Sequence, residues 1–381
     1  MFASFFQAGF ECSTHRRRDG RRLDLIAATG HDAAVGADYR QVAGLGLRTV
    51  RDGLRWHLIE TAPGRYDWSS FLPMLRAARD LGIEVIWDLC HYGWPDEIDV
   101  WRPEFVDGFA AFAAAAARLI RSETDAAPWF CPVNEISFLA WAAGDKAYMH
   151  PFGRKRGGEF KRQMVRASLA AMTAIRAVEG RARFVQAEPA IHVAGDPSRP
   201  RSCKAAERLT LLQFEAWDML SGAAAPELGG SPDSLDVLGV NYYADNQWFR
   251  RRGRTLEPGD PHYRPFRDIL AEIYRRYRRP LFIAETGREG DGRGPWLRLI
   301  AEEVRGAIAA GVPVEGICLY PVLDYPGWDD GRHCACGLLG APGPASRRPL
   351  HEPLAAELKR QQAIFQRLFA ASGATRRAQA G

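Results

Sequence analysis

The sequence predicts a single (β/α)8 TIM barrel, an α/β fold, and three observations predict it. Short apolar runs alternate with longer segments of helical period, which is the pattern of parallel strands joined by helices. The short runs number eight, which is the number that closes such a barrel. No glycine-rich phosphate turn follows the first run, whereas an open doubly wound sheet often carries one there.

The expected strands are eight apolar runs bounded by turn residues. They span residues 5–10, 49–53, 84–89, 129–133, 183–187, 237–241, 281–284 and 316–320. Between them, apolar residues recur three or four positions apart, as at Leu72, Leu75 and Ala78, which is the period of an amphipathic helix. These helical segments span residues 70–81, 104–121, 160–178, 205–220 and 296–310, and a last one at 353–369 closes the outer ring.

The chain is expected to form one domain with long loops at the C-terminal face of the barrel. Its 381 residues, 46% of them hydrophobic, supply a full core, and α/β barrels of this length usually fold as one unit. Two long connections, residues 140–159 and 244–265, follow the carboxyl ends of the fourth and sixth strands and are expected to shape a substrate cleft. We place the barrel at residues 1–370 and expect residues 371–381, which are small and polar, to form a disordered tail.

The charge and hydropathy of the chain argue against nucleic-acid and membrane partners. The formal net charge of +5 is small for a chain with 51 Lys and Arg against 46 Asp and Glu. The arginine clusters at residues 16–18, 250–252 and 275–279 lack the interleaved aromatic residues of a nucleic-acid module, and such clusters usually form solvated faces. No apolar stretch approaches the roughly 18 residues that cross a bilayer.

The seven cysteines are odd in number and scattered, which favours free thiols in a reducing compartment. The first residues lack the basic segment and cleavage site of a secretory signal, so we expect a cytoplasmic protein. His333, Cys334 and Cys336 cluster, but no second cysteine pair accompanies them. We therefore expect neither a metal nor another cofactor.

Two glutamates follow expected strands and carry the functional prediction. Glu135 lies in FCPVNEIS, after the fourth strand, and Glu285 lies in LFIAETG, after the seventh. Taken singly, each glutamate is more simply read as an ion-pair partner of an arginine at the barrel rim. Taken together, they match glycoside hydrolysis, which needs one protonated and one ionised carboxyl group on opposite sides of the scissile bond. Strands four and seven face each other across a barrel mouth, so the pair is geometrically credible.

Seven short segments give the chain a specific resemblance, in order, from the second strand to the eighth. They read RTVRDGLRWHLIE, GRYDW, VIWDLCHYGWP, PVNEIS, DVLGVNYY, FIAETG and GICLYPVLDYPGW. The chain thereby resembles glycoside hydrolase family 1 and its retaining relatives in clan A, whose corresponding motifs are similar to YRFSISW, HWDLP, TLNEP, FLGINYY, ITENG and WSLLDNFEW. The resemblance spans most of the chain, although it consists largely of short motifs.

The resemblance implies roles for particular residues. It makes Glu135 the acid/base, with the neighbouring Asn134 contacting the sugar 2-hydroxyl, and it makes Glu285 the nucleophile. It also implies that Arg51 and Tyr243 orient the nucleophile and keep it ionised, in agreement with the donors that such a carboxylate needs. Retention of configuration requires the two carboxyl groups about 5 to 5.5 Å apart.

The same resemblance implies residues that hold the sugar. His91 matches the histidine of the third strand that binds a sugar hydroxyl, and Trp328 matches the tryptophan that closes the eighth motif. Aromatic rings stack on the apolar faces of sugars, so Tyr320, after the eighth strand, and Trp94 are further candidates, whereas Trp56 and Trp87 are expected to pack in the barrel.

The sequence departs from the family at the sugar-binding positions. Gly327 stands where the family usually carries a glutamate that grips the outer hydroxyls, and Tyr320 replaces the usual tryptophan. Acidic residues that could compensate are Asp324, Asp329 and Asp330, although an acidic loop is equally often only solvated. In the first strand, FQAGFECSTH leaves open whether Gln7, Glu11 or His15 takes the role of the family's glutamine. The departures leave the mechanism intact and the glycone undefined.

These observations predict a retaining β-glycosidase that acts on a carbohydrate or glycoside, or a transglycosylase with the same site. One alternative is a clan relative that acts on an unusual glycone, such as a furanoside or a deoxy or modified sugar. A second is a catalytically silent carbohydrate-binding barrel. The pair of carboxylates with its arginine and tyrosine argues against the silent barrel, which has no need of them. The oligomeric state is left open.

Overall fold

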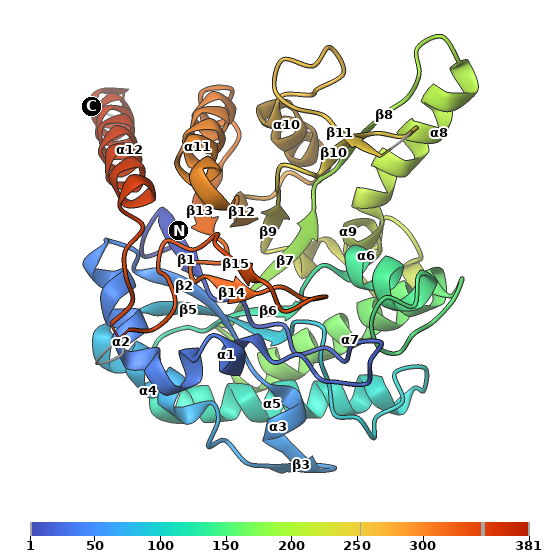
Figure 1. The fold of residues 1–381 in the computed structure, drawn as a ribbon. Helices are drawn as coiled ribbons and strands as arrows, with labels where there is room; N and C mark the ends of the chain where they lie inside the picture. Colours follow the sequence, from blue (N-terminus) through green and yellow to red (C-terminus); the bar gives the residue numbers. More distant parts are fainter. Residues whose placement is uncertain (1, 252, 344–346, 380–381) are drawn as a thin grey trace.

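The computed structural model describes residues 2–251, 253–343 and 347–379, without the side chains of residues 372–379. Eight parallel strands close into one barrel, which confirms the predicted fold class (Figure 1). In spatial order they are β1 (Phe6–Gly9), β2 (Thr49–Gly53), β5 (Glu84–Cys90), β6 (Trp129–Val133), β7 (Arg183–Pro189), β9 (Val237–Asn241), β12 (Leu281–Thr286) and β13 (Val314–Leu319), and β13 pairs back to β1.

The strand ends decide which side chains reach the barrel mouth. β2, β6 and β9 have the bounds expected from the sequence, and the other strands differ from expectation by one or two residues at their ends. β7 continues to Pro189, so Glu188 belongs to the strand, and β12 continues to Thr286, so Glu285 does too. The apolar runs therefore extend into polar residues at the carboxyl ends, where the site lies.

The interior of the barrel is filled by side chains from consecutive strands. Ile86, Trp129, Val237 and Phe282 form part of a buried cluster inside the strands, and Phe2 packs against it, with its ring centroid 4.7 Å from that of Trp129. This filling leaves no channel through the barrel, as is usual for eight strands. The site therefore lies above this filling, at the carboxyl ends of the strands.

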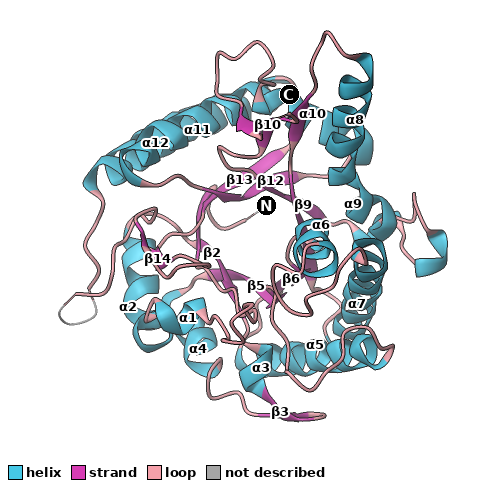
Figure 2. Ribbon diagram, turned by 45° about the vertical axis from the view of Figure 1, so that its right-hand side comes forward, coloured by secondary structure: helices cyan, strands magenta, loops and turns pink. Residues whose placement is uncertain are grey.

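A ring of helices surrounds the strands, as Figure 2 shows. The main helices are α2 (His31–Gly44), α4 (Leu72–Leu81), α5 (Glu104–Glu123), α7 (Gly157–Val178), α8 (Pro200–Leu211), α9 (Glu215–Leu220), α10 (Phe266–Tyr277), α11 (Arg293–Ala309) and α12 (Glu352–Gln379). The single helix expected over residues 205–220 is divided by a 3-10 turn at Leu212–Phe214, since the redirected chain buries Phe214 and Trp217. α2 and α10 lie outside the helical segments expected from the sequence.

The boundary expected at residue 371 stays a prediction. α12 continues past it to Gln379, but the side chains of residues 372–379 and all of residues 380–381 lie outside the described part of the chain. Within the described part, α12 docks on the first strand because Phe365 stacks on Phe5, with ring centroids 4.5 Å apart, and meets Phe6 edge-on.

Long loops cover the carboxyl ends of the strands. The loop after β6 contains α6 (Ile136–Leu139) and a π-helical turn, Ala140–Asp145. The loops after β7 and β9 form a small sheet of β8 (His192–Ala194), β10 (Gln247–Phe249) and β11 (Arg254–Thr255), and the loop after β13 contributes β14 (Tyr325–Pro326) and β15 (His333–Cys334).

Shorter elements complete the chain: α1 (Leu25–Ala28), α3 (Trp56–Ile59), β3 (Glu60–Ala62) and β4 (Arg65–Tyr66). All seven cysteines lie in the described residues and are free thiols. None of the described helices combines the length and the apolar character needed to cross a membrane.

Candidate active site

Glu135 lies directly after β6 with a backbone conformation that side chains rarely adopt. Its φ is 44°, in the left-handed region, and it caps the first turn of α6. Strained residues of this kind persist where the surrounding structure fixes them, and they cluster at functional sites. Its carboxylate accepts hydrogen bonds from Tyr92 Oη to Oε2 (2.8 Å) and from Asn241 Nδ2 to Oε1 (2.9 Å). Both partners are neutral.

Glu285, at the end of β12, has a charged partner instead. Its side chain is buried, and Oε1 accepts a hydrogen bond from Arg51 Nη1 at 2.8 Å, while Oε2 accepts one from Tyr243 Oη at 2.9 Å. Hydrogen bonds from an arginine and a hydroxyl stabilise the ionised form of a carboxyl group. The contacts match those that the resemblance implied for Arg51 and Tyr243.

Arg51 connects the two glutamates. From β2, it donates from Nε and Nη2 to the two carboxylate oxygens of Asp88, at 2.9 and 2.7 Å, and from Nη2 to Asn134 Oδ1 at 2.6 Å. Asn241 Nδ2 is 3.4 Å from the same Asn134 oxygen and also bonds Glu135. Glu285, Arg51, Asn134, Asn241 and Glu135 thus form one continuous network across the barrel mouth, although β7 and β9 separate β6 from β12.

Burial and charge divide the roles of the two acids. Burial, with a further contribution from the nearby Glu285 carboxylate, raises the pKa of Glu135 to about 8. Burial also raises the pKa of Glu285, whereas the charges of Arg51 and His91 and the Tyr243 hydroxyl act to lower it. When one proton is shared between two neighbouring carboxyl groups, it resides on the one without a cation. The geometry therefore places the proton on Glu135 and the negative charge on Glu285.

The Arg51 guanidinium stays charged although it is fully buried. Burial alone would lower its pKa, but the carboxylates of Asp88 and Glu285 raise it further, so the pKa of Arg51 lies above its ordinary value. A buried cation flanked by two acids in hydrogen-bonding geometry is a compensated charge. Removal of the cation would leave two buried carboxylates without a partner.

His91 and Glu11 lie beside the network. His91 Nδ1 bonds Asp88 Oδ2 at 2.8 Å, and its Nε2 is 3.2 Å from Asn134 Nδ2 and 3.8 Å from Glu11 Oε1. Burial acts to lower the pKa of His91, but the bond to Asp88 and the charge of Glu11 outweigh it and raise the pKa above its ordinary value. Glu11 also accepts hydrogen bonds from the backbone N–H and the hydroxyl of Ser13.

The aromatic candidates Tyr320 and Trp328 also lie beside the network. Tyr320 lies parallel to His91, with ring centroids 6.0 Å apart, and its ring lies 5.6 Å from the Arg51 guanidinium carbon. Trp328, partly buried, contacts the rings of His15 at 4.8 Å and Tyr92 at 5.7 Å. Its indole Nε1 is buried and has no hydrogen-bond partner within the described residues. Such an unsatisfied donor is unusual and suits a site that receives a polar ligand.

Two candidate residues are not brought to this network. Gln7 lies in β1 opposite Cys318, its side chain directed toward Gly316 and buried within the barrel, and its amide atoms have no partner among the described residues. It precedes Glu11 by four residues along a strand, so it lies well below the mouth. Asp324 is held within its own loop by the Gly337 N–H at 2.8 Å and by His333 and Arg293. That loop geometry, which depends on distant residues, is invisible in the sequence.

Several residues of the network are not among those expected from the sequence. Asp88, Tyr92 and Asn241 hold Arg51, His91 and Glu135, and Glu188 accepts the Ser137 N–H at 3.1 Å, just after Glu135. Burial raises the pKa of Glu188 to about 7. The available signal was a polar residue at the end of an otherwise apolar strand, as in VIWDL, VLGVN and VQAEP.

The site offers poor metal ligands. The ligand atoms of Cys12, Asp88 and His91 lie within 4.8 Å of one another, and they form the only such group among the described residues. However, both Asp88 oxygens already bond Arg51, and one of them also bonds His91 Nδ1. Burial and the charge of Asp88 raise the pKa of the Cys12 thiol well above its ordinary value, so it remains protonated.

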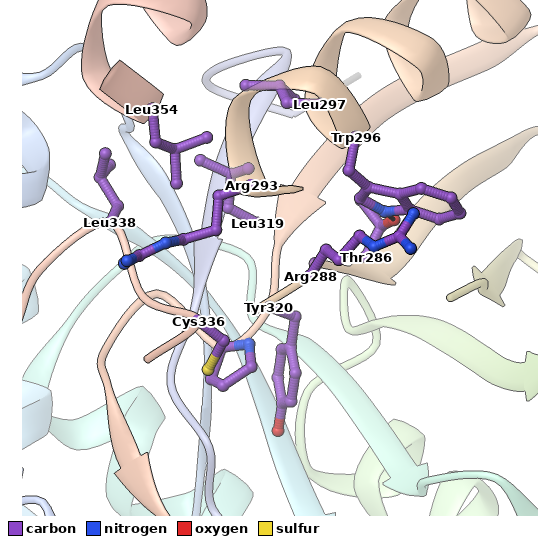
Figure 3. A pocket seen from close by; sticks show the side chains of 12 residues that line it. Thr286, Arg288, Arg293, Trp296, Leu297, Leu319, Tyr320, Cys336, Leu338 and Leu354 are labelled. Atoms are coloured by element: carbon purple, nitrogen blue, oxygen red, sulfur yellow. Dashed lines mark hydrogen bonds between the residues drawn. The ribbon is translucent and has the colours of Figure 1, made fainter. Parts of the chain in front are cut away.

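A small cavity lies behind Tyr320, between β13 and the helices α11 and α12. Figure 3 shows Trp296 and Leu297 of α11, Leu354 of α12, and the Tyr320 hydroxyl directed away from α11. Its volume of about 10 Å³ is that of one water molecule. This cavity lies against Tyr320 and is too small to hold a sugar.

No protein-family model matches the chain, and no curated protein matches its sequence. Solved structures match its fold. A family 1 β-glucosidase from Thermotoga maritima superposes with a TM-score of 0.76 and 14% identity over 93% of this chain and 96% of that one. The Thermotoga maritima β-glucosidase in complex with glucoimidazole gives 0.77 and 14% over 95% and 99%. A hyperthermophilic β-glucosidase mutant gives 0.73 and 15% over 93% and 98%. At such identities the likeness is one of fold.

Proposed function

We propose that the chain is a retaining β-glycosidase in which Glu285 is the nucleophile and Glu135 the general acid/base. The observation that carries the proposal is the unequal environment of two glutamates in one buried network. Glu285 bonds a buried arginine and a tyrosine, and Glu135 bonds only neutral donors. A double displacement needs this division, with one ionised and one protonated carboxyl group. The β-glucosidase folds that superpose on the chain support the same class of substrate.

In the first step, a Glu285 oxygen attacks the anomeric carbon and forms an ester, while the bond to the aglycone oxygen breaks and Glu135 gives its proton to that oxygen. In the second step, Glu135, now ionised, takes a proton from water, whose oxygen attacks the same carbon and releases Glu285. An alcohol in place of water would give transglycosylation. Arg51 and Tyr243 hold Glu285 charged before attack and receive it again after the ester breaks.

A second candidate, an unusual glycone on the same mechanism, is favoured by the loop after β13. Gly327 offers no side chain to grip outer sugar hydroxyls, and the carboxylate of Asp324 is engaged by its own loop. The polar groups that remain on the glycone side are His91, the acceptor Glu11 and the unpartnered indole donor of Trp328. We propose that this set recognises a glycone other than the glucose of the structural neighbours.

A panel of nitrophenyl glycosides tests the proposal, with proton NMR of the first product formed from the best substrate. The expected first product keeps the configuration of the substrate. Glu135→Gln should lose activity by about 10² to 10⁴ on alkyl glycosides, whose leaving groups need a proton, and much less on dinitrophenyl glycosides. Glu104→Gln, an exposed glutamate on α5, is the control and should lose nothing.

Glu285→Ala should abolish turnover of both kinds of substrate while circular dichroism remains that of the parent protein. Inversion of configuration, or equal losses of Glu135→Gln on good and poor leaving groups, would contradict the assignment of the two glutamates. No activity with any glycoside of a broad panel would favour the carbohydrate-binding barrel.

A further inference from the structure

An apolar groove of about 700 Å³ opens beside the candidate active site. It lies between α6 with its π-helical turn, the start of α7, the end of α8, and the loops that carry β8 and β10. Figures 1 and 2 both draw α6 beside α7 and α9 at this side of the barrel. The apolar side chains that matter here are Phe138, Trp141, Ile191, Leu209, Leu212 and Trp248, and we call the space they line the apolar groove.

The apolar groove exposes large hydrophobic side chains to water. Trp141 is 50% exposed and Leu212 is 44% exposed, and both belong to the few large hydrophobic residues that are exposed in the described part of the chain. Scattered single exposures are ordinary, but two that face the same concave space mark a binding surface. Binding of an apolar group in the groove is therefore favourable, because it removes these side chains from water.

Three polar side chains of the apolar groove, Lys161, Asp145 and Gln213, are engaged within the protein. Lys161 Nζ is 2.5 Å from Glu215 Oε2, and Asp145 accepts the Gly157 N–H at 2.7 Å. Gln213 accepts from Ile191 N and donates to Thr210 O. A second sugar would need free donors and acceptors aimed at its hydroxyls. The groove offers mainly hydrocarbon surface instead.

A series of aromatic rings joins the apolar groove to the network that contains Glu135. Phe138 has its ring centroid 6.2 Å from Trp328 and 5.6 Å from Tyr92, whose hydroxyl bonds Glu135, and 5.9 Å from Trp141 in the groove. Ser137, two residues after Glu135, also lines the groove. The groove thus begins on the side of Glu135, which is the side where a leaving group must depart.

We propose that the apolar groove binds an aglycone with an extended hydrocarbon chain, so that the natural substrate is an amphiphilic glycoside. The inference rests on the proposed function, because it assigns the leaving group of that reaction. The glycone sits against Glu285 and His91, the scissile oxygen faces Glu135, and the hydrocarbon chain runs past Phe138 to Trp141 and Leu212. Burial of apolar surface supplies the affinity and the polar head remains with the catalytic network.

A series of alkyl glycosides from methyl to octyl, built on the glycone that the nitrophenyl panel selects, tests the inference. Each buried methylene contributes about 0.8 kcal/mol, which corresponds to about a fourfold rise in kcat/KM per methylene at full burial. Trp141→Ala and Leu212→Ala should each lower the octyl-to-methyl ratio of kcat/KM several-fold. Leu211→Ala is the matched control, because Leu211 is 47% exposed but does not line the groove, and it should leave the ratio as it is.

A second experiment measures binding in the apolar groove without turnover. Octan-1-ol is titrated into the protein, and tryptophan fluorescence is followed in the parent and in Trp141→Phe. We expect a saturable change in fluorescence. Trp141→Phe should diminish this change, Leu212→Ala should weaken the binding, and Leu211→Ala should leave both as they are. If the fluorescence shows no saturable change, the proposed binding of a hydrocarbon chain in the groove is wrong, whatever the activity of the protein.

The outcomes separate the two proposals. Turnover of methyl glycosides with no gain from longer chains would overturn the apolar groove and leave the proposed function standing. A preference for disaccharide over alkyl glycosides would overturn it in favour of a sugar-binding subsite. A dimer in solution that Trp141→Ala dissociates would assign the surface to a second copy of the chain. Saturable octanol binding without any glycosidase activity would support hydrocarbon binding in the groove and overturn the proposed function.

Discussion

At the scale of single residues, the chemistry depends on where one proton resides. Arg51 bonds Glu285 and not Glu135, and this one contact makes the two carboxyl groups unequal. The neutral donors of Glu135, Tyr92 and Asn241, stabilise its ionised form only modestly and leave its pKa raised to about 8 by burial. An acid with such a pKa is protonated near neutral pH and still gives its proton readily.

The pH dependence of kcat/KM should therefore be bell-shaped, with a basic limb near pH 8 that reports loss of the Glu135 proton. Tyr92→Phe removes a hydrogen bond that lowers the pKa of Glu135, so the basic limb should move to higher pH. Glu188→Gln removes a negative charge that raises this pKa, so the limb should move to lower pH. Shifts of the same sign in both variants would show that the limb belongs to another group.

Site residues within the recognisable motifs were easier to predict from the sequence than the residues that hydrogen-bond to them. Glu135, Glu285, Arg51, Asn134, Tyr243 and His91 fall in one network, as the order of the motifs implied. Asp88 and Asn241 escaped notice because the role of a polar residue at a strand end depends on its partner from another strand. For the same reason, Gln7 and Asp324 could not be excluded before the structure placed their side chains.

At the scale of elements, the strands were predictable because each is a buried apolar run with turn residues at both ends. The helix ends were less predictable, because the 3-10 turn at Leu212–Phe214 depends on how Phe214 and Trp217 are buried against neighbouring elements. The last helix, α12, matters for the barrel because Phe365 packs on Phe5 and Phe6 where the first strand begins.

Phe365→Ala should lower the free energy of unfolding by about 3 to 5 kcal/mol, the usual cost of removing a buried aromatic ring. Phe369→Ala is the matched control one turn later, where the ring is 40% exposed, and it should cost well under half as much. Urea unfolding followed by circular dichroism measures both losses. Equal losses would mean that α12 does not dock through Phe365.

At the scale of the whole molecule, the closed barrel brings residues from distant parts of the chain to one network. The network spans Glu11, near the start of the chain, to Glu285 and Tyr320, and the ends of the chain are also joined because Arg348 bonds Asp38 at 2.6 and 2.9 Å. The strand count made this architecture predictable. The glycone and the aglycone were not predictable, because they depend on loop residues whose arrangement the motifs do not define.

The most direct test of the central claim, that Glu285 is a nucleophile, is trapping of the covalent intermediate. The protein is incubated with an activated 2-deoxy-2-fluoro donor of its preferred glycone, and intact mass and peptide mapping follow. We expect one fluoroglycosyl group on Glu285, formed in step with the loss of activity, and none on Glu285→Ala. An adduct on another residue, or none while the same glycone is turned over, would contradict this claim.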